Sequence, residues 1–399
     1  MLRFITAGES HGRGLTGIIE GIPAGLPISS QYIDTQLQRR QRGYGRGGRM
    51  KIESDHAEIL SGVRHGKTTG SPISLFIENK DWKNWQDIMA VEPLRADIKK
   101  VTRPRPGHAD LAGLLKYGHD DIRNILERSS ARETAMRVAL GAVARRFLEE
   151  FNIIIGSYVL SIGGKGFKPY EMQDIWPSDE KLLETFKKAE VSEVRCPDDA
   201  LTLEIKRLID QASEEGNTLG GVFEVFAINV PPGLGSPIQW DRRLNARLMN
   251  ALSSIPAIKA VEIGAGTLAG ISKGSEVMDE IFYEPPGDKS KSWGYFRKTN
   301  FAGGIEGGIS NGMPVIARLS MKPIPTLKRP LRSVDISTHE PVEASYERSD
   351  ICAVPAASVI AEAMLSLVIA QAFLEKFGGD SIEETRANYE SYLKMLKRR

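Results

Sequence analysis

The sequence is poor in cysteine and in net charge, and it lacks the common catalytic motifs. It holds two cysteines, Cys196 and Cys352, without a CxxC pair, so a disulfide framework is excluded and two reduced thiols are expected. A net charge of +2 excludes a general attraction to nucleic acid, and any anion binding must therefore be local. No HExxH, GxSxG, P-loop or dinucleotide fingerprint is present, so we expect no metal site and no Rossmann-type dehydrogenase.

Long apolar runs are also scarce. The N-terminus has no apolar segment of the kind that signal peptides carry. Residues 354–377 are apolar over most of their length, but Glu362, Gln371 and Glu375 interrupt the run, and carboxylates are costly in a lipid-facing helix. We therefore expect a helix in the core or at a subunit interface, no contact with a membrane, and a cytoplasmic protein.

Hydrophobic periodicity predicts a mixture of strands and helices. Strands are expected at 4–5, 15–20, 52–60, 73–77, 153–162, 221–230, 260–263 and 314–321. Helices are expected at 30–40, 121–151, 198–215, 241–255, 356–377 and 384–399. The length alone suggests two or three domains, but no linker divides the polar runs described below, so we expect a single domain over residues 1–399.

Two histidines lie in polar, glycine-flanked runs. His11 lies in Gly-Glu-Ser-His-Gly, where nothing apolar surrounds it, and this favours a functional role over a structural one. His108 follows Gly107 and two Arg-Pro steps, which suits a histidine that protonates a departing phosphate. The other four histidines have no spacing that suggests a metal site.

A third polar run, Arg-Ser-Ser-Ala-Arg-Glu-Thr, interrupts the helix predicted for residues 121–151. On that helix Arg128 and Arg132 would be four residues apart and would share one face. Two serines beside two such arginines suit a buried anion or cofactor site, and a solvated stripe is the competing interpretation.

Residues 39–49 hold five arginines and four glycines, which predicts a loop that stays flexible until an anion orders it. Such a tract can bind single-stranded RNA, although Tyr44 is its only aromatic residue. An arginine cluster for carboxylates and phosphate is the other interpretation. Near the C-terminus, Glu-Arg-Ser-Asp at 347–350 adds a further carboxylate–arginine pair, or a plain surface salt bridge.

Taken together, these runs closely resemble the motifs of the chorismate synthase family, in the family's order and over essentially the whole chain. The matching motifs are GESHG at 8–12, RPGHAD at 105–110, RSSARET at 128–134, GGISNG at 307–312, and ERSD with AVPAAS at 347–358. The resemblance implies an α+β fold in which β-sheets sandwich a helical layer, and a homotetramer.

The resemblance also implies a reaction and a cofactor. The family converts 5-enolpyruvylshikimate 3-phosphate into chorismate by a 1,4-anti elimination of phosphate. It requires reduced FMN without net redox change, and NADPH is kept open as the reductant of FMN. The substrate carries two carboxylates and a phosphate, which agrees with arginines on several separate loops.

By resemblance, three residues are catalytic: His11 beside the reduced flavin, His108 as the acid for the phosphate, and Asp350, with the flavin N5, as the route for the ring proton. The residues implied in FMN binding are Arg128, Ser129, Ser130, Pro256, Ala257, Gly307, Lys322, Pro323, Ile324, Pro325, Thr326 and Arg348. Those implied in binding substrate or NADP are Ser10, Arg40, Arg46, Arg49, Arg105 and Arg132. Pro256 replaces the family's usual asparagine, so only a backbone carbonyl contact could remain there.

Two other functions stay open on the sequence. A flavin-dependent reductase would consume a nicotinamide cofactor in proportion to product. An RNA-binding module built on residues 39–49 would bind single strands with a steep salt dependence, although the low net charge disfavours it.

Overall fold

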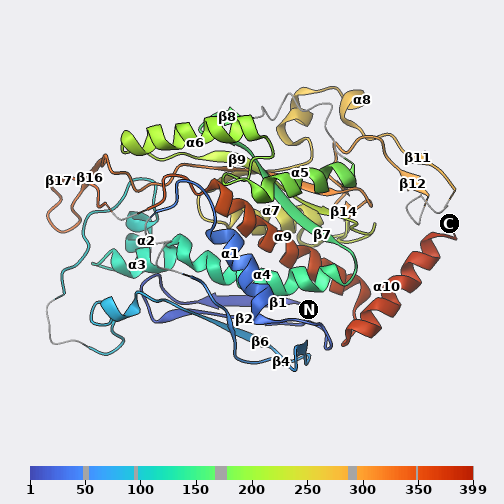
Figure 1. Cartoon of the computed structure of the whole chain (residues 1–399), viewed down its shortest axis with the longest axis horizontal. Helices are drawn as coiled ribbons and strands as arrows, with labels where there is room; N and C mark the ends of the chain where they lie inside the picture. Colours follow the sequence, from blue (N-terminus) through green and yellow to red (C-terminus); the bar gives the residue numbers. More distant parts are fainter. Residues whose placement is uncertain (48–53, 94–97, 167–177, 286–293, 347–348, 399) are drawn as a thin grey trace.

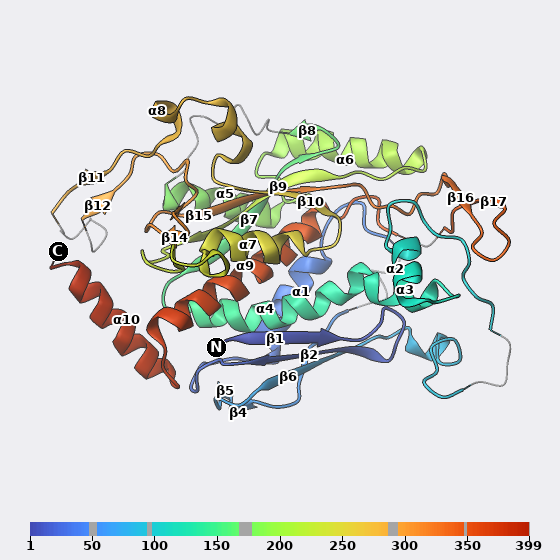
Figure 2. The same ribbon diagram turned by 180° about the vertical axis from the view of Figure 1, so that it is seen from behind.

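Two β-sheets enclose a layer of helices in the computed structural model of the chain, which describes residues 1–47, 54–93, 98–166, 178–285, 294–346 and 349–398 (Figure 1). The layer contains helices α1, α4, α7 and α9, while α5 and α6 cover the outer face of the larger sheet (Figure 2). The α+β arrangement of sheets around a helical layer, expected from the sequence, is confirmed.

The smaller sheet is antiparallel and has the strand order β1-β2-β6-β3. Its strands are β1 (Arg3–Ala7), β2 (Gly14–Glu20), β6 (Ile73–Glu78) and β3 (Glu58–Ile59). Alternate residues of β2 and β6 are buried, which turns one face of the sheet toward α4. Gly17 permits this approach, because a Cβ atom there would lie 2.6 Å from the side chain of Met136.

The larger sheet has the order β10-β15-β9-β7-β8. Its strands are β10 (Ile258–Ile263), β15 (Val315–Met321), β9 (Gly221–Ile228), β7 (Ile154–Ile162) and β8 (Lys165–Gly166). β7 is buried along almost its whole length, because α9 covers one face of the sheet and α5 the other. That double cover explains its nearly continuous apolar sequence.

The central helices are α1 (Ser30–Gln41), α4 (Thr134–Glu149), α7 (Leu244–Ser253) and α9 (Val354–Phe377). Ser29 caps α1 by accepting a hydrogen bond from the Tyr32 N–H. α9 is long and apolar enough to cross a membrane, but 89% of its apolar window is buried inside the protein. α9 is therefore the core helix that the interrupted apolar run led us to expect.

Smaller elements surround these layers. The helices are α2 (Asp110–Tyr117), α3 (Arg123–Ser129), α5 (Asp179–Val191), α6 (Asp199–Glu214), α8 (Gly274–Val277) and α10 (Ile382–Leu396). The hairpins pair β4 (Val63–Arg64) with β5 (Lys67–Thr68), β11 (Phe282–Tyr283) with β12 (Tyr295–Phe296), β13 (Ile305–Glu306) with β14 (Ile309–Ser310), and β16 (Arg332–Val334) with β17 (Pro341–Glu343). The glycine-rich run at 303–312 thus forms tight turns. Of the strand expected at 52–60, only β3 forms within the described part.

The single helix predicted for residues 121–151 is wrong. The chain forms α3, a 3-10 turn at Ala131–Glu133 and then α4, because Ser130 adopts an extended conformation (φ −64°, ψ 142°). The Ser130 hydroxyl accepts from the Arg132 N–H, and the Thr134 hydroxyl donates to the Ala131 carbonyl. These short side chains compete with the helix for backbone groups, and Arg128 and Arg132 consequently share no helix face.

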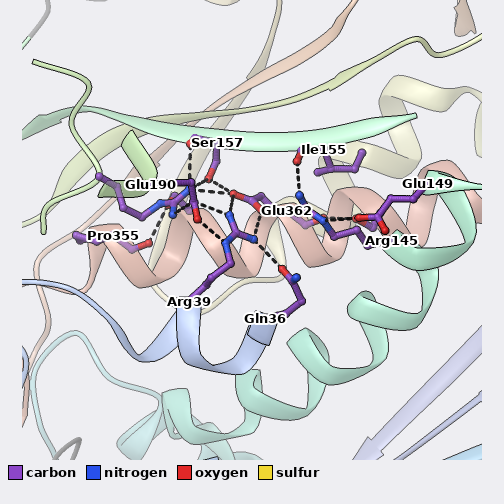
Figure 3. A network of polar contacts seen from close by, with 12 residues as sticks. Gln36, Arg39, Arg145, Glu149, Ile155, Ser157, Glu190, Pro355 and Glu362 are labelled. Atoms are coloured by element: carbon purple, nitrogen blue, oxygen red, sulfur yellow. Dashed lines mark hydrogen bonds and ion pairs between the residues drawn. The ribbon is translucent and has the colours of Figure 1, made fainter. Parts of the chain in front are cut away.

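A buried ion network joins α1 to the core (Figure 3). The carboxylate of Glu362 on α9 accepts hydrogen bonds from Arg39 (2.7 and 2.9 Å) and from Arg145 (2.6 Å). It also accepts from Arg195 at 3.0 Å and from the Ser157 hydroxyl at 2.6 Å. Both Glu362 and Arg39 are buried, so the last turn of α1 is fixed against α9.

Candidate functional site

Polar side chains from several distant segments meet where α1 ends and α4 begins. Arg40, the residue after the buried Arg39, donates to the Ala131 carbonyl at 3.0 Å and to the Thr134 hydroxyl at 3.1 Å. α2, α3 and the β16–β17 hairpin lie at the same end of the molecule (Figure 2). This end therefore gathers several of the polar runs noted in the sequence.

Arg40 and Arg132 share the buried carboxylate of Asp55. Arg132 bonds to Asp55 Oδ1 and donates from Nε to Asn79 Oδ1 at 2.9 Å. Nη1 of Arg40 lies 3.6 Å from Asp55 Oδ2, and within the described residues neither atom has a hydrogen-bond partner. Burial lowers the pKa of Arg40 to about 10, with Asp55 opposing that effect. A buried guanidinium with a spare donor is suited to an anionic ligand.

Asp350 binds residues 46 and 47 of the arginine- and glycine-rich segment at 39–49. It accepts from Arg46 Nη1 at 2.8 Å and from the Gly47 N–H at 2.6 Å. The Ile351 N–H donates to the Gly45 carbonyl at 2.8 Å. Asp350 and the neighbouring backbone thus supply partners for residues 45–47. The ordering of the segment by an anion stays a prediction. Arg49 and Arg348 lie outside the described residues.

His108 is bound to a buried carboxylate. Its Nδ1 lies 2.5 Å from Oδ1 of Asp110, whose other oxygen accepts from Arg105 Nε at 2.8 Å. Burial opposes ionisation of Asp110, but the hydrogen bonds from His108 and Arg105 outweigh it and hold the pKa of that carboxyl well below its usual range. Asp110 is consequently an acceptor, so the His108 Nδ1 carries a hydrogen.

The loop from Lys322 to Thr326 joins three parts of the site. The Lys322 ammonium donates to the Gly107 carbonyl, and Arg105 donates to the Thr326 hydroxyl at 3.3 Å. The Ser349 hydroxyl donates to the Thr326 carbonyl at 3.2 Å, which links the loop to the Asp350 segment. Within the loop, Pro323 is exposed, Pro325 is half-buried, and the Ile324 carbonyl accepts from the Thr218 hydroxyl at 2.7 Å.

The turn formed by Pro256 and Ala257 lies against the same loop. Ala257 has a positive φ of 69°, and its carbonyl accepts from the Lys322 N–H at 3.0 Å. Pro256, which replaces the family's asparagine, therefore lies in a turn in which the Ala257 carbonyl already accepts a hydrogen bond. Gly307 is not part of this group, since Gly308 beside it contacts the N-terminus of α7 through the Leu244 N–H.

His11 lies on the loop between β1 and β2 and is bound by Glu127 of α3. The His11 Nδ1 lies 2.9 and 3.0 Å from the two carboxylate oxygens of Glu127. The backbone N–H of His11 donates to Oε2 of the same carboxylate at 2.8 Å. The ring stacks on Trp85 with 3.8 Å between centroids. Burial opposes ionisation of Glu127, but the hydrogen bonds and the charge of His11 outweigh burial and lower the pKa of Glu127.

The serines and Arg128 of the third run hold the same loop. The Ser130 hydroxyl donates to the Ser10 hydroxyl at 3.1 Å, and Ser129 is the last residue of α3. Arg128 donates to the carbonyls of Thr6 and Gly8 at 3.0 and 3.1 Å. Arg128 thus holds the loop that carries His11, and it does not form a joint anion site with Arg132 on one helix face.

Several side chains of this site were not predicted from the sequence: Asp55, Asn79, Trp85, Asp110, Arg123 and Glu127. Asp110 is the last residue of the RPGHAD motif and Glu127 immediately precedes RSSARET, and these positions were the available signal. Asp55 and Trp85 have no such signal. Among the described residues, no group of three or more His, Cys, Asp or Glu side chains could hold a metal ion.

Comparison with known proteins agrees with this arrangement. The family model described as Chorismate synthase matches residues 2–374. Chorismate synthases of Aquifex aeolicus and Trichlorobacter lovleyi are 59% and 57% identical to the chain, over 99% of it and over 98% and 100% of their own lengths. A crystal structure titled chorismate synthase superimposes with a TM-score of 0.81 at 50% identity, covering 100% of this chain and 99% of the other.

Proposed function

The chain belongs to the chorismate synthase family, and we propose that the polar cluster described above is its active site. The enzyme is a lyase of the shikimate pathway that removes phosphate from 5-enolpyruvylshikimate 3-phosphate to give chorismate. The observation that carries the proposal is the spare donor of the buried Arg40, which lies among Arg46, Arg132 and Asp350. Near neutral pH the substrate carries three or four negative charges, so donors of this kind can bind it.

We propose that reduced FMN is the cofactor. The buried Nε of Arg123 and Nη1 of Arg40 have no hydrogen-bond partner within the described residues, which is consistent with a further polar ligand. The residues that would hold FMN are Arg128, Ser129, Ser130, Pro256, Ala257, Lys322, Pro323, Ile324, Pro325 and Thr326, with Arg348 from outside the described part. When bound, reduced FMN supplies electron density to the substrate ring and recovers it. NADPH is the proposed reductant of FMN.

His108 would act as the acid for the departing phosphate. Asp110 fixes a hydrogen on Nδ1, so the proton that the imidazolium gives up is the one on Nε2. Arg105 donates to Asp110 through two nitrogens and holds the carboxylate in place. The pair therefore presents a proton at a defined atom, as a general acid must.

Asp350, with the flavin N5, would form the route for the proton of the ring C–H. One of its oxygens accepts from Arg46 and the other from the Gly47 N–H, and these contacts hold the carboxylate in one orientation. A substrate anion that binds Arg46 would share that guanidinium with Asp350, so substrate binding and the position of Asp350 would be linked through Arg46.

We also propose that the chain is a single domain that assembles as a cytoplasmic homotetramer. Gly307, which the family resemblance assigns to the flavin site, lies in the turn of the β13–β14 hairpin, next to the Gly308 carbonyl that accepts from the Leu244 N–H. Light scattering that gave a monomer would contradict the proposed tetramer.

An anaerobic assay tests the proposed function. With dithionite-reduced FMN, the protein should release one phosphate for each chorismate formed. It should not consume a nicotinamide cofactor in proportion to the chorismate formed. Consumption of one reductant for each product would indicate a flavin-dependent reductase. Omission of FMN, or its use in oxidised form, should abolish turnover.

A further inference from the structure

Three side chains that no motif predicted enclose His11. The Glu127 carboxylate is hydrogen-bonded to Nδ1 and to the backbone N–H of His11, as described above. Trp85 covers one face of the ring with an interplanar angle of 23°. Arg123 joins these two partners, because it donates to Glu127 at 3.1 Å and lies 5.1 Å from the Trp85 ring centroid.

The carboxylate determines which nitrogen of His11 carries the hydrogen. Glu127 is almost fully buried, with 2% of its side chain exposed, and it is ionised at neutral pH because its pKa lies below the ordinary value. An ionised carboxylate only accepts hydrogen bonds. Nδ1 must therefore donate, and the lone pair of the neutral ring lies on Nε2.

The ring plane is fixed by the other two partners. Trp85 is itself held by its indole N–H, which donates to Asp81 at 2.9 Å. Arg123 contacts both Glu127 and the face of Trp85. The orientation of His11 thus depends on α3 on one side and on the segment around Trp85 on the other.

We infer that Glu127, Arg123 and Trp85 are positioning residues that hold His11 with a hydrogen on Nδ1 and its acceptor on Nε2. The relevance of this clamp to turnover rests on the proposed function, in which His11 lies beside the reduced flavin. The tautomer itself is a property of the resting protein. It can therefore be measured without cofactor or substrate.

Nitrogen-15 NMR of the histidine rings tests the tautomer directly, with the His11 signals assigned from their loss in His11→Asn. The wild-type protein should show the Nδ1–H form in the pH range in which the ring carries one hydrogen. Glu127→Leu should convert His11 to the Nε2–H form that free imidazole side chains prefer, and the His108 signals should stay unchanged as an internal control. A wild-type Nε2–H ring, or an unchanged tautomer in Glu127→Leu, would overturn the inference.

Glu127→Gln is a second variant that tests the same inference if Glu127→Leu does not fold. The amide has nearly the same shape and can present either its oxygen or its nitrogen to Nδ1, so both tautomers should be populated. A single Nδ1–H form in this variant, together with wild-type turnover, would count against the need for the carboxylate.

Kinetics separate positioning from general support of the fold. Glu127→Leu should lower kcat by about 10- to 100-fold with little change in KM for 5-enolpyruvylshikimate 3-phosphate. Adding it to His11→Ala should cost nothing further, since residues that act as a unit are not additive. Additive losses would show that Glu127 acts independently of His11. If the chain did not turn over this substrate at all, the tautomer result would still stand, so the two failures are distinguishable.

Discussion

Arg40 and Asp55 face each other across 3.6 Å, with a donor and an acceptor that have no other hydrogen-bond partner within the described residues. Both side chains are buried, so the unused groups cost roughly 1–3 kcal/mol each. An anionic group that reaches Arg40 would recover part of that cost. The arrangement therefore favours the ligand-bound state.

Arg40→Met should raise KM for 5-enolpyruvylshikimate 3-phosphate by about 10- to 100-fold, which corresponds to the loss of one charge-assisted hydrogen bond. The unbranched methionine fills much of the same space without the charge. Steady-state kinetics with reduced FMN measure the effect. Arg64→Met, at an exposed position of the β4–β5 hairpin, should leave KM unchanged.

His108→Ala should lower kcat by about 10²- to 10⁴-fold, the usual range for loss of a general acid. His11→Ala should cost less, with substrate binding largely kept, because its proposed partner is the flavin. His65→Asn is a matched control, because His65 is exposed with a φ of 50° and asparagine tolerates that conformation. Full activity of both active-site variants between pH 6 and 9 would refute the two-histidine assignment.

Sequence patterns predicted the layers of the fold better than they predicted the contacts of the site. Alternation in β2 and the continuous apolar runs of β7 and α9 reflect burial, which depends on local residues. The break at Ser130 was missed, because it depends on side-chain hydrogen bonds that no periodicity records. Asp55 was missed because its partners come from α1 and from the 3-10 turn that precedes α4, and the latter is far away in the chain.

Asp350→Ala should expose the peptide bond after Arg46 to trypsin. Arg46 is bound to Asp350 and 10% of its side chain is exposed, so wild-type cleavage there should be slow when no ligand is added. The variant loses that ion pair and the bond from the Gly47 N–H. Mass spectrometry of short digests identifies the cut. Equally slow cleavage in the variant would mean that the backbone contact between Gly45 and Ile351 alone holds the segment.

The Glu362 network should make stability depend on pH in acid. Burial would raise the pKa of Glu362, but Arg39, Arg145 and Arg195 lower it to about 2, from an ordinary value of 4.5. A lowered pKa in the folded state contributes stability that is complete above pH 4.5 and is lost as the pH falls toward 2. The contribution is roughly 3 kcal/mol, since each pKa unit corresponds to about 1.4 kcal/mol. Urea unfolding at pH 7, 5, 4 and 3 measures it.

Glu362→Gln isolates this contribution from the other carboxylates that titrate in the same range. At pH 7 the variant should be destabilised by about 3–5 kcal/mol, because the buried Arg39 and Arg195 and the half-buried Arg145 lose a charged partner. The difference from wild type should shrink steadily below pH 4.5, as the wild-type carboxyl also becomes neutral. Glu184→Gln, which breaks the exposed pair with Lys188, should have little effect at any pH. A Glu362→Gln difference that stayed constant down to pH 3 would show that shape and hydrogen bonding, rather than the charge of Glu362, hold Arg39 and the end of α1 in place.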